Sequence, residues 1–509
     1  MSVSDPAQKP SRLGGLPIYP AVLAFTFVLA AFIDADVNLH AAVRPMVLVV
    51  VGVAVVTLLL SFAIGPLWGG IATGVIVLVG RSGTLVHGAL ALLLVALVAA
   101  AYVLARRIWR HSDALRHPTP LLNTLSIALL AVTVVSAAVD GSLGRIDVRQ
   151  GAPASALEAD LTRAPGERPD VYILLLDGYP RADTIGRLFG GDNRAFLGSL
   201  QRLGFDVSGS ASSNYMYTGP TFTSMFHMQY VDDVARLGEV EVPFGVSLRS
   251  SINNNPVWDT FRAHGYQVVT VKGPWEHEAM RSSDVFCGDS INDFELFLVR
   301  TTLAGSALES LASGLEADQH RAAVNEAFDC LGRMDGLTAE PKLVFVHIGG
   351  PHLPIVFDES GGPADPEVFA HTRQELALSD AEFADAYMDQ LRYLNGRVLD
   401  AASELANRPD EPVLVVMSDH GSEAALNWTD GSRSDLAERF GILFAARTPG
   451  HPQLFDCNIT PIEVFPALLN TYLDEDLPTP EPRHFVSSVN DKLGFQEVAD
   501  PDGDVNCAQ

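Results

Sequence analysis

The sequence predicts an α/β domain with a mostly parallel sheet flanked by helices, preceded by an all-α membrane domain of about five transmembrane helices. Three observations lead to this prediction. Hydrophobic residues make up 48% of the 509 residues, although the formal net charge is −27. Long apolar runs fill the first part of the chain, and the acidic residues follow them. In the second part, short apolar runs alternate with helical patterns.

The acidic residues are almost confined to the second part of the chain. Only four of the 61 acidic residues come before Asp140, together with eight of the 34 Lys and Arg residues. This acidity argues against nucleic acid as a partner, because phosphate backbones are held by clustered Lys and Arg. We interpret it as a contribution to solubility.

Five apolar runs are candidates for transmembrane helices, since about 20 residues cross a hydrocarbon core. They cover residues 17–35, 45–64, 66–80, 84–105 and 120–139. The third run is short, and Pro66 separates it from the second, so a re-entrant hairpin is an alternative to two crossings. No acidic residue lies in the middle of a run, which weakens a transporter interpretation. We therefore expect an integral membrane protein whose helices serve mainly as an anchor.

The basic residues predict the orientation, because cytoplasmic loops carry an excess of Lys and Arg. Lys9 and Arg12 precede the first run, and four arginines crowd the link between the fourth and fifth runs. With five crossings both segments lie in the cytoplasm, and everything after Asp140 lies outside the cell membrane. A cleaved signal peptide is the alternative for the first run, but further apolar segments follow it.

These patterns divide the chain into a transmembrane domain (1–139), a linker (140–169) and an extracytoplasmic domain (170–509). The linker is rich in Gly, Ala, Pro and charged residues. All four cysteines follow it, and four cysteines allow three pairings. Their order in the chain suggests Cys287–Cys330 and Cys457–Cys507, with free buried thiols as the alternative.

Four short apolar runs in the last domain predict buried parallel strands. They are Val171–Leu176, Gln267–Val271, Leu343–Ile348 and Val413–Met417. Helical patterns lie between them, around Arg194–Leu203, Thr301–Arg333 and Ala381–Ala406. This alternation predicts a mostly parallel sheet with helices on both faces.

Three of these strands end in residues that can carry chemistry. Asp177 follows the first strand, Asp419 and His420 follow the fourth, and His347 and His352 lie at the end of the third. Ligands in such sheets bind beyond the carboxyl ends of the strands. An isolated Asp there is usually a turn residue, but an adjacent carboxylate and imidazole can bind a divalent metal.

Taken in order, these segments resemble the sulfatase branch of the alkaline phosphatase superfamily over about residues 170–480. The family's nucleophile motif, Cys/Ser/Thr-x-Pro-x-x-x-Ser, is matched by Thr218-Gly-Pro-Thr-Phe-Thr-Ser224. Pro351-His352-Leu-Pro354 and Ser418-Asp419-His420-Gly421 are similar to two further family elements. The segment from Thr460 to Leu469 looks like a late helix of the family.

Three departures from the sulfatase pattern point away from sulfate ester hydrolysis. Thr218 cannot yield the formylglycine that sulfatases make from Cys or Ser. Phe222 stands where sulfatases have Arg, and Gly178 stands where they have a second Asp. The pattern is closer to lipoteichoic acid synthases, phosphoethanolamine transferases and nucleotide phosphodiesterases. The membrane anchor resembles the layout of lipoteichoic acid synthases most, although that group usually has Glu at the position of Asp177.

The resemblance implies a sulfatase-like phosphotransferase or phosphoric ester hydrolase. In such an enzyme Asp177, Thr218, Asp419 and His420 would hold one divalent cation, Mn²⁺, Mg²⁺ or Zn²⁺. Thr218 would be the nucleophile and form a phospho-threonine intermediate. His352 would hydrogen-bond a phosphate oxygen or protonate the leaving group. The donor would be a membrane lipid, and the acceptor an envelope glycan or lipid.

Several alternatives remain open at this point. Thr221 and Thr223 are rivals of Thr218, and His347 is more typical of a core or supporting histidine than of a ligand. Lys272 and His277 follow another strand, where solvated loop residues are the usual case. A hydrolase with water as acceptor shares all chemistry up to the intermediate. A non-catalytic protein of the same fold is the third possibility.

Overall fold

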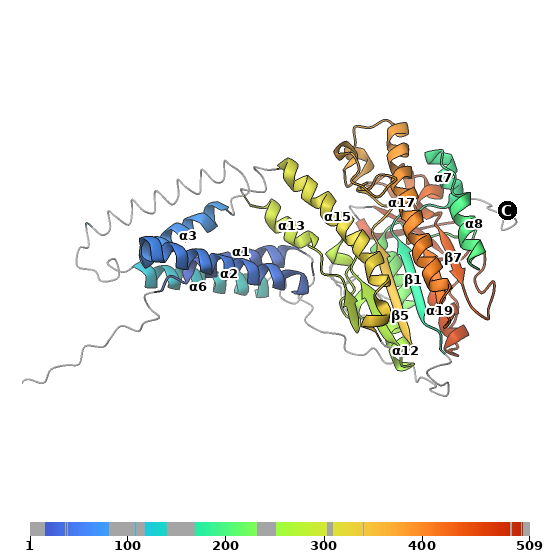
Figure 1. Cartoon of the computed structure of the whole chain (residues 1–509), viewed down its shortest axis with the longest axis horizontal. Helices are drawn as coiled ribbons and strands as arrows, with labels where there is room; N and C mark the ends of the chain where they lie inside the picture. Colours follow the sequence, from blue (N-terminus) through green and yellow to red (C-terminus); the bar gives the residue numbers. More distant parts are fainter. Residues whose placement is uncertain are drawn as a thin grey trace, which may run out of the picture. The chain divides into compact units, whose positions relative to one another are not determined.

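The computed structural model describes most of the 509-residue chain. The described residues are 16–35, 37, 39–80, 107, 118–139, 168–231, 251–302, 309–338, 341–488, 491–499 and 501. The chain forms two compact units, which we call the helical unit and the sheet unit (Figure 1). The helical unit comprises residues 1–148 and 291–315, and the sheet unit comprises residues 149–290 and 316–509.

Four apolar helices lie side by side in the helical unit (Figure 1). They are α1 (Tyr19–Asp34), α2 (Leu39–Ile64), α3 (Pro66–Gly80) and α6 (Pro118–Val139). Asn123 of α6 joins two of them, because its Oδ1 accepts hydrogen bonds from Ile18 N and Tyr19 N, both at 3.1 Å. Polar contacts of this kind hold helices together where the surroundings are apolar.

The structure supports two of the predicted membrane spans by length and composition. α2 has 26 residues and α6 has 22, whereas α1 and α3 have 16 and 15. Gly65, with φ of 88°, separates α2 from α3, and Pro66 begins the new helix. The predicted run 84–105 lies outside the described residues. The number of five crossings therefore stays a prediction.

The sheet unit contains the predicted α/β fold. Its seven strands lie in the order β2-β7-β6-β1-β5-β3-β4. They are β1 (Val171–Leu176), β2 (Asp206–Val207), β3 (Gln267–Val271), β4 (Val285–Cys287), β5 (Lys342–Ile348), β6 (Val413–Met417) and β7 (Phe444–Arg447). The four predicted strands form the parallel centre, and only β7 and β2 run antiparallel to their neighbours. The mostly parallel sheet is therefore confirmed.

Helices cover both faces of this sheet. The sheet unit has α7 (Ala182–Phe189), α8 (Arg194–Arg202), α9 (Thr218–His227), α12 (Pro256–Ala263), α16 (Met334–Leu337), α17 (Asp380–Ala406), α18 (Leu436–Phe440) and α19 (Pro461–Tyr472). Four short 3-10 helices are η4 (Glu276–Glu278), η5 (Pro366–Val368), η6 (Arg373–Glu375) and η7 (Gly431–Arg433). A separate hairpin pairs β8 (His484–Ser488) with β9 (Asp491–Val498).

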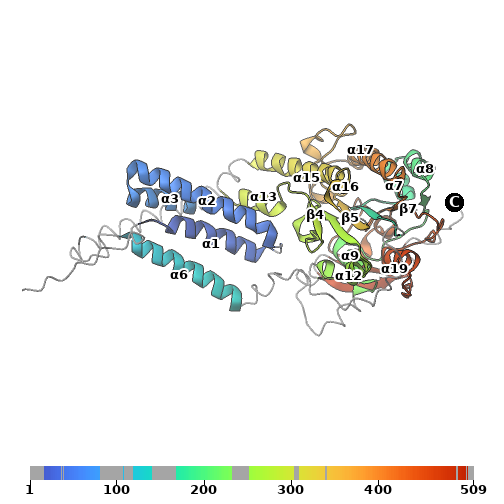
Figure 2. The same ribbon diagram turned by 60° about the horizontal axis from the view of Figure 1, so that its bottom comes forward.

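Alternate residues of β1 enter two different hydrophobic cores. Tyr172, Leu174 and Leu176 pack with α7, α8 and α17. Val171, Ile173 and Leu175 pack with α9, α12 and α19. Figure 2 shows these two groups of helices on opposite sides of the sheet. Because β1 is buried on both faces, its sequence is continuously apolar rather than alternating.

The predicted helix over Thr301–Arg333 differs from the structure at its start. Thr301 is the C-cap of α13 (Asp293–Arg300), a separate helix, and α15 covers Glu309–Leu331. Residues 303–308 between them lie outside the described part. Residues 291–315, which the sequence analysis placed within the extracytoplasmic domain, belong to the helical unit.

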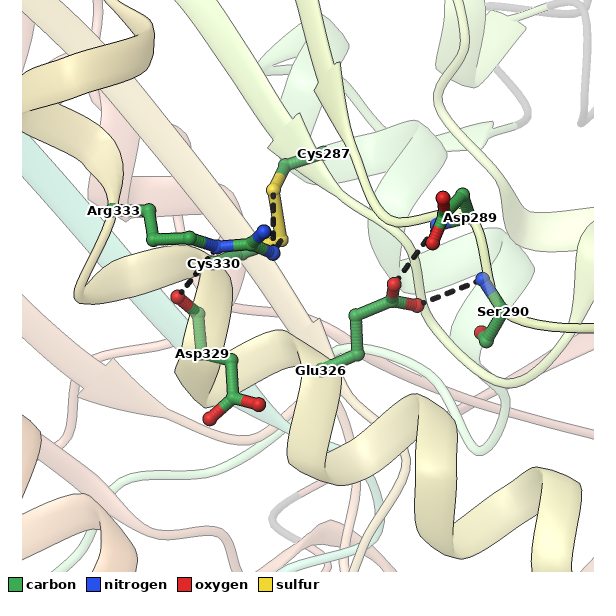
Figure 3. The surroundings of a disulfide bond; sticks show 7 residues. All are labelled: Cys287, Asp289, Ser290, Glu326, Asp329, Cys330 and Arg333. Atoms are coloured by element: carbon green, nitrogen blue, oxygen red, sulfur yellow. Dashed lines mark hydrogen bonds between the residues drawn. A yellow bond between two sulfur atoms is a disulfide. The ribbon is translucent and has the colours of Figure 1, made fainter.

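A disulfide joins Cys287, at the end of β4, to Cys330 in α15 (Figure 3). This is the first of the two predicted pairs. Cys457 is disulfide-bonded as well, and Cys507 lies outside the described residues. Disulfides are typical of oxidising compartments, so the cysteines agree with an extracytoplasmic sheet unit.

Candidate active site

The strand order brings the predicted site residues together. β1 lies between β6 and β5, and all three are parallel. Their carboxyl ends therefore place Asp177, Asp419, His420 and His347 at one edge of the sheet. Gly178 follows Asp177 with φ of 68°, a left-handed conformation that favours glycine. At Gly421 a Cβ atom would lie 1.8 Å from Glu438 O, so only glycine fits after His420.

Four side-chain atoms converge at this edge. His420 Nε2 lies 3.3 Å from Thr218 Oγ1, 3.5 Å from Asp177 Oδ1 and 3.3 Å from Asp419 Oδ2. Ligands about 2.0–2.1 Å from a tetrahedral Zn²⁺ lie about 3.3–3.4 Å from one another. Each of these distances from His420 Nε2 is compatible with a shared cation, although the group with cation-ligand spacing at His420 comprises Asp177, His352 and His420.

Each of the two carboxylates also has one oxygen without a hydrogen bond in the described part of the chain. Asp177 Oδ1 and Asp419 Oδ2 accept no hydrogen bond among the described residues, although both side chains are buried. Burial, together with the neighbouring charge of Asp177, raises the pKa of Asp419 to about 7. Two adjacent buried carboxylates cost free energy unless a cation balances them. This arrangement therefore favours a metal site over a structural ion pair.

His420 is held in the form that can bind a cation. Its Nδ1 lies 2.9 Å from Gly421 O, so Nδ1–H donates to that carbonyl and Nε2 is left as the ligand atom. Burial and the nearby charge of Arg439 lower the pKa of His420 well below its usual value. The neutral ring therefore predominates near pH 7.

Of the three threonines in its stretch, Thr218 is the one whose hydroxyl meets the His420 ring. It is the first residue of α9, and its hydroxyl faces His420. The Thr221 hydroxyl lies 3.0 Å from Tyr217 O and 3.3 Å from Asp419 O, so its proton is donated to backbone carbonyls. Thr223 is fully buried. The N-terminus of α9 also points partial positive charge toward the site, which suits a phosphate group.

His352 lies beside the same group of ligand atoms. Its backbone N donates to Asp177 O at 3.0 Å, and its Nδ1 lies 2.6 Å from Leu353 O. Asp177, His352 and His420 each offer one ligand atom within 4.8 Å of the others. Burial lowers the pKa of His352, but the charges of Asp177 and Glu423 outweigh it and raise the pKa overall.

His347 takes a supporting place on the far side of Asp177. Its Nε2 lies 3.2 Å from Asp177 Oδ2, and its Nδ1 lies 3.5 Å from Glu278 Oε2. Burial lowers the pKa of His347, but the hydrogen bond to Asp177 and the charge of Glu278 raise it to about 9. Burial likewise raises the pKa of Asp177, yet the surrounding histidines hold it below its usual range. Asp177, Glu278 and His347 form a second group with cation-ligand spacing.

The remaining sequence candidates have other roles or lie outside the described part. Lys272 Nζ donates to Ser290 O at 2.9 Å and to Ser290 Oγ at 2.8 Å, and these hydrogen bonds hold the loop that follows β4. The side chain of His277 is outside the described residues. Phe222, at the position of the sulfatase Arg, packs edge-on against His347 with ring centroids 5.0 Å apart. Tyr387 of α17 donates to Gly178 O at 3.2 Å, so this helix lies beside the site.

Three functional candidates escaped the sequence analysis. Glu278 sits in a loop, and no spacing rule links it to His347. Glu423 is buried three residues after His420, and neither of its carboxylate oxygens has a hydrogen bond among the described residues. Arg439 is buried and donates to Met216 O and Gly421 O at 2.7 and 2.9 Å. In the sequence, Arg439 is marked only by its charge, within the short segment before β7.

Comparison of the sequence with models of protein families and with curated proteins finds no match. Solved structures of similar fold do exist. One is the integral membrane protein lipooligosaccharide phosphoethanolamine transferase A from Neisseria meningitidis, with 15% identity and a TM-score of 0.41 over 76% of this chain and 68% of that one.

Two further structures extend this comparison. The C-terminal periplasmic domain of EptC from Escherichia coli has 14% identity and a TM-score of 0.43, over 68% of this chain and 96% of that domain. The same domain is also known in complex with Zn. BT1596, a 2-O GAG sulfatase, has 12% identity and a TM-score of 0.37, over 63% of this chain and 78% of that one.

Proposed function

We propose that the chain is a membrane-anchored phospho-alcohol transferase that acts through a phospho-threonine intermediate. The observation that supports the proposal is the convergence of Thr218 Oγ1, Asp177 Oδ1 and Asp419 Oδ2 around His420 Nε2. This set of ligands suits one divalent cation, Mn²⁺, Mg²⁺ or Zn²⁺. When bound, such a cation lowers the pKa of a coordinated hydroxyl and offsets charge on phosphate oxygens.

The residues of the chain divide the chemistry into two steps. In the first, the Thr218 hydroxyl loses its proton to water and its oxygen bonds to phosphorus, while the bond to the donor alcohol breaks. His352 gives a proton to that leaving oxygen. In the second, an acceptor alcohol attacks the phosphorus and gives its proton to His352. The Thr218 oxygen then leaves and regains a proton, which restores the enzyme.

The electrostatics support these roles. The raised pKa of His352 favours its protonated form, as an acid for the leaving alcohol requires. The first turn of α9 presents backbone N–H groups next to Thr218, and such groups stabilise developing negative charge on phosphate oxygens. Asp177, Asp419 and His420 keep the nucleophile in a fixed position. His347 holds Asp177 in place through the hydrogen bond at 3.2 Å.

The helical unit supports a lipid as the donor. Long apolar helices keep the sheet unit at a membrane, where a lipid phosphodiester is always available. The disulfide and the arginine distribution both favour the extracytoplasmic side. The acceptor would then be an envelope glycan or lipid.

The test uses the full chain in detergent with nitrophenyl phosphodiester, phosphomonoester and sulfate substrates, each with Mn²⁺, Mg²⁺ or Zn²⁺. We expect phosphodiester turnover that falls on the order of 10⁶-fold in Thr218→Ala, as when the nucleophile of a serine protease is removed. Mass spectrometry of trapped protein should locate the phosphoryl group on residue 218.

A matched control comes from the same stretch. Thr223→Val removes a buried hydroxyl without changing the shape of the side chain, and it should retain activity. Activity that survives Thr218→Ala, or turnover of the sulfate ester, would contradict the proposal. Release of free phospho-alcohol from a lipid donor even when an alcohol acceptor is present would favour a hydrolase.

A further inference from the structure

Residues 291–315 interrupt the sheet unit and belong to the helical unit. The chain is firmly held where it leaves the sheet unit. Glu326 of α15 accepts hydrogen bonds from Asp289 N at 2.9 Å and Ser290 N at 3.2 Å (Figure 3). Close by, the Cys287–Cys330 disulfide closes the loop that contains the whole segment. We call residues 291–315 the excursion, and these contacts join the described residues before it to α15.

The helix at the start of this excursion, α13, packs on the ends of α1 and α2. Phe294 is 2% exposed and meets Phe32 of α1 with ring centroids 6.3 Å apart. Asn292 Nδ2 donates to Ala41 O at 3.3 Å. Glu295 accepts hydrogen bonds from both Nε and Nη2 of Arg44. These contacts fix the position of α13 along α2 to the turn that contains Ala41 and Arg44.

That turn lies just outside the apolar part of α2. The 20 residues from Pro45 to Ile64 carry no charge, and 20 helical residues span about 30 Å, the thickness of a hydrocarbon core. The charged pair Arg44–Glu295 therefore lies at the boundary between hydrocarbon and water. α13 lies at the same level, because it supplies Glu295.

α13 is more apolar than its contacts with α1 and α2 require. Five of its eight residues are hydrophobic, and they are spread around the helix. Phe297 and Val299 remain 45% and 46% exposed, and Ile291, just before the helix, is 53% exposed. A helix that is hydrophobic on several sides needs an apolar surrounding beyond one packing face. On α2 the adjacent Val43 and Val47 are exposed as well.

We propose that α13 is an interfacial helix that lies in the outer boundary layer of the phospholipid bilayer and anchors residues 291–315 there. Ile291, Phe297 and Val299 contact lipid there, while Phe294 and Glu295 fix the helix to α1 and α2. The occupant of the exposed surface is phospholipid, because α13 is fixed at Ala41 and Arg44, where the exposed apolar part of α2 begins. The sheet unit then has an attachment to the membrane in the middle of its own sequence, in addition to the linker 140–169.

The test places a bimane fluorophore on single introduced cysteines in the full chain, reconstituted in phospholipid nanodiscs. Phe297→Cys reports on α13. Leu59→Cys, exposed in the apolar part of α2 near its C-terminal end, is the positive control. Leu337→Cys, which is 44% exposed at the end of α16, is the negative control of similar exposure. Lipids with a doxyl quencher near the headgroup replace part of the bilayer in a parallel sample.

We expect a loss of bimane fluorescence at positions 297 and 59 in the doxyl nanodiscs and no change at position 337. The additional variant Phe294→Asp should detach α13 and restore the signal at position 297. A signal at position 297 that matches position 337 would overturn the proposal, as would the absence of quenching at position 59.

A second measurement uses the unaltered protein and so does not depend on any substitution. A phospholipid with a diazirine close to its ester groups is activated by light in the reconstituted sample, and the labelled peptides are identified by mass spectrometry. Labels on residues 291–300 support the proposal. Crosslinks from these residues to a second copy of the chain, without lipid labels, would identify a protein contact and overturn it.

Discussion

At the amino ends of the central strands, the buried charges come in matched pairs. Asp170, just before β1, lies 2.6 Å from the ammonium of Lys342, the first residue of β5, and 3.9 Å from Arg408. At the carboxyl ends of the same strands, Asp177 and Asp419 are equally buried, but only histidines lie near them. A buried carboxylate thus has lysine and arginine partners at one edge of the sheet and histidine neighbours at the other.

The difference separates a structural role from a functional one. A buried ion pair with both partners present needs nothing more, and its loss is a loss of stability. His347 offsets the charge of Asp177, but Asp419 faces the neutral His420, so its charge destabilises the fold unless something binds there. Substitutions at the two edges should therefore change stability in opposite directions.

The largest expected effect on stability lies at the amino ends. Lys342→Met leaves Asp170 buried without its closest cation, and we expect the free energy of unfolding to fall by about 3–5 kcal/mol. Urea unfolding of the full chain in detergent measures this change. Adding Asp170→Asn in the same chain should restore much of the loss. A loss below about 1 kcal/mol would mean that the two edges do not differ as described.

At the carboxyl ends, the same kind of change should remove metal binding. Asp419→Asn takes away a ligand, and we expect the affinity for Zn²⁺ or Mn²⁺ to fall at least about 100-fold, or about 2.7 kcal/mol. Titration calorimetry and metal analysis of the purified protein measure it. Asp400→Asn, an exposed position on α17, is the control that should bind as the wild type does. Unchanged affinity in Asp419→Asn would rule out the site.

Without a bound metal, the buried Asp419 should make the stability of the folded protein depend on pH. Because the folded-state pKa of Asp419 is raised from 3.8 to about 7, the folded state binds its proton more tightly than the unfolded state does. Stability from this group is complete below about pH 4 and is lost as the pH rises to about 7. In the presence of a chelator, the melting temperature of Asp419→Asn should therefore be higher than that of the wild type at pH 8, but not at pH 4. Equal melting curves at pH 8 would contradict this.

Glu423 should give the smallest effect of the series. Burial raises its pKa, and neither carboxylate oxygen has a hydrogen bond among the described residues. Its ionisation in the folded state therefore costs stability above its usual pKa. Glu423→Gln should stabilise the protein by about 1 kcal/mol at pH 8 and by less at pH 4. Thermal unfolding at the two pH values measures this, and a destabilised variant at pH 8 would show that the carboxylate has a partner.

The parallel centre of the sheet was predictable because strands buried on both faces are short, uninterrupted apolar runs. The edge strands were not, since β2 has two residues and β4 has three. β7 pairs only over four residues and runs antiparallel. No local pattern distinguishes such strands from loops.

The site was predictable as far as it depends on strand ends. Asp177, Asp419 and His420 follow predicted strands, and parallel neighbours bring such ends together. Glu278 and Arg439 could not be found this way, because their places depend on loop conformation. The same limit applies to α13, since an eight-residue apolar helix has the same sequence pattern whether it covers a core or a membrane helix.

The excursion also links the folding of the two units. Ala41 and Arg44 are made early during synthesis, but their partners Asn292 and Glu295 come 251 residues later. Until then Phe32 lacks its contact with the Phe294 ring. Contacts between such distant residues close late, because the chain entropy of a long loop must first be lost. The first helices to be synthesised therefore reach their final packing only after more than half of the chain has left the ribosome.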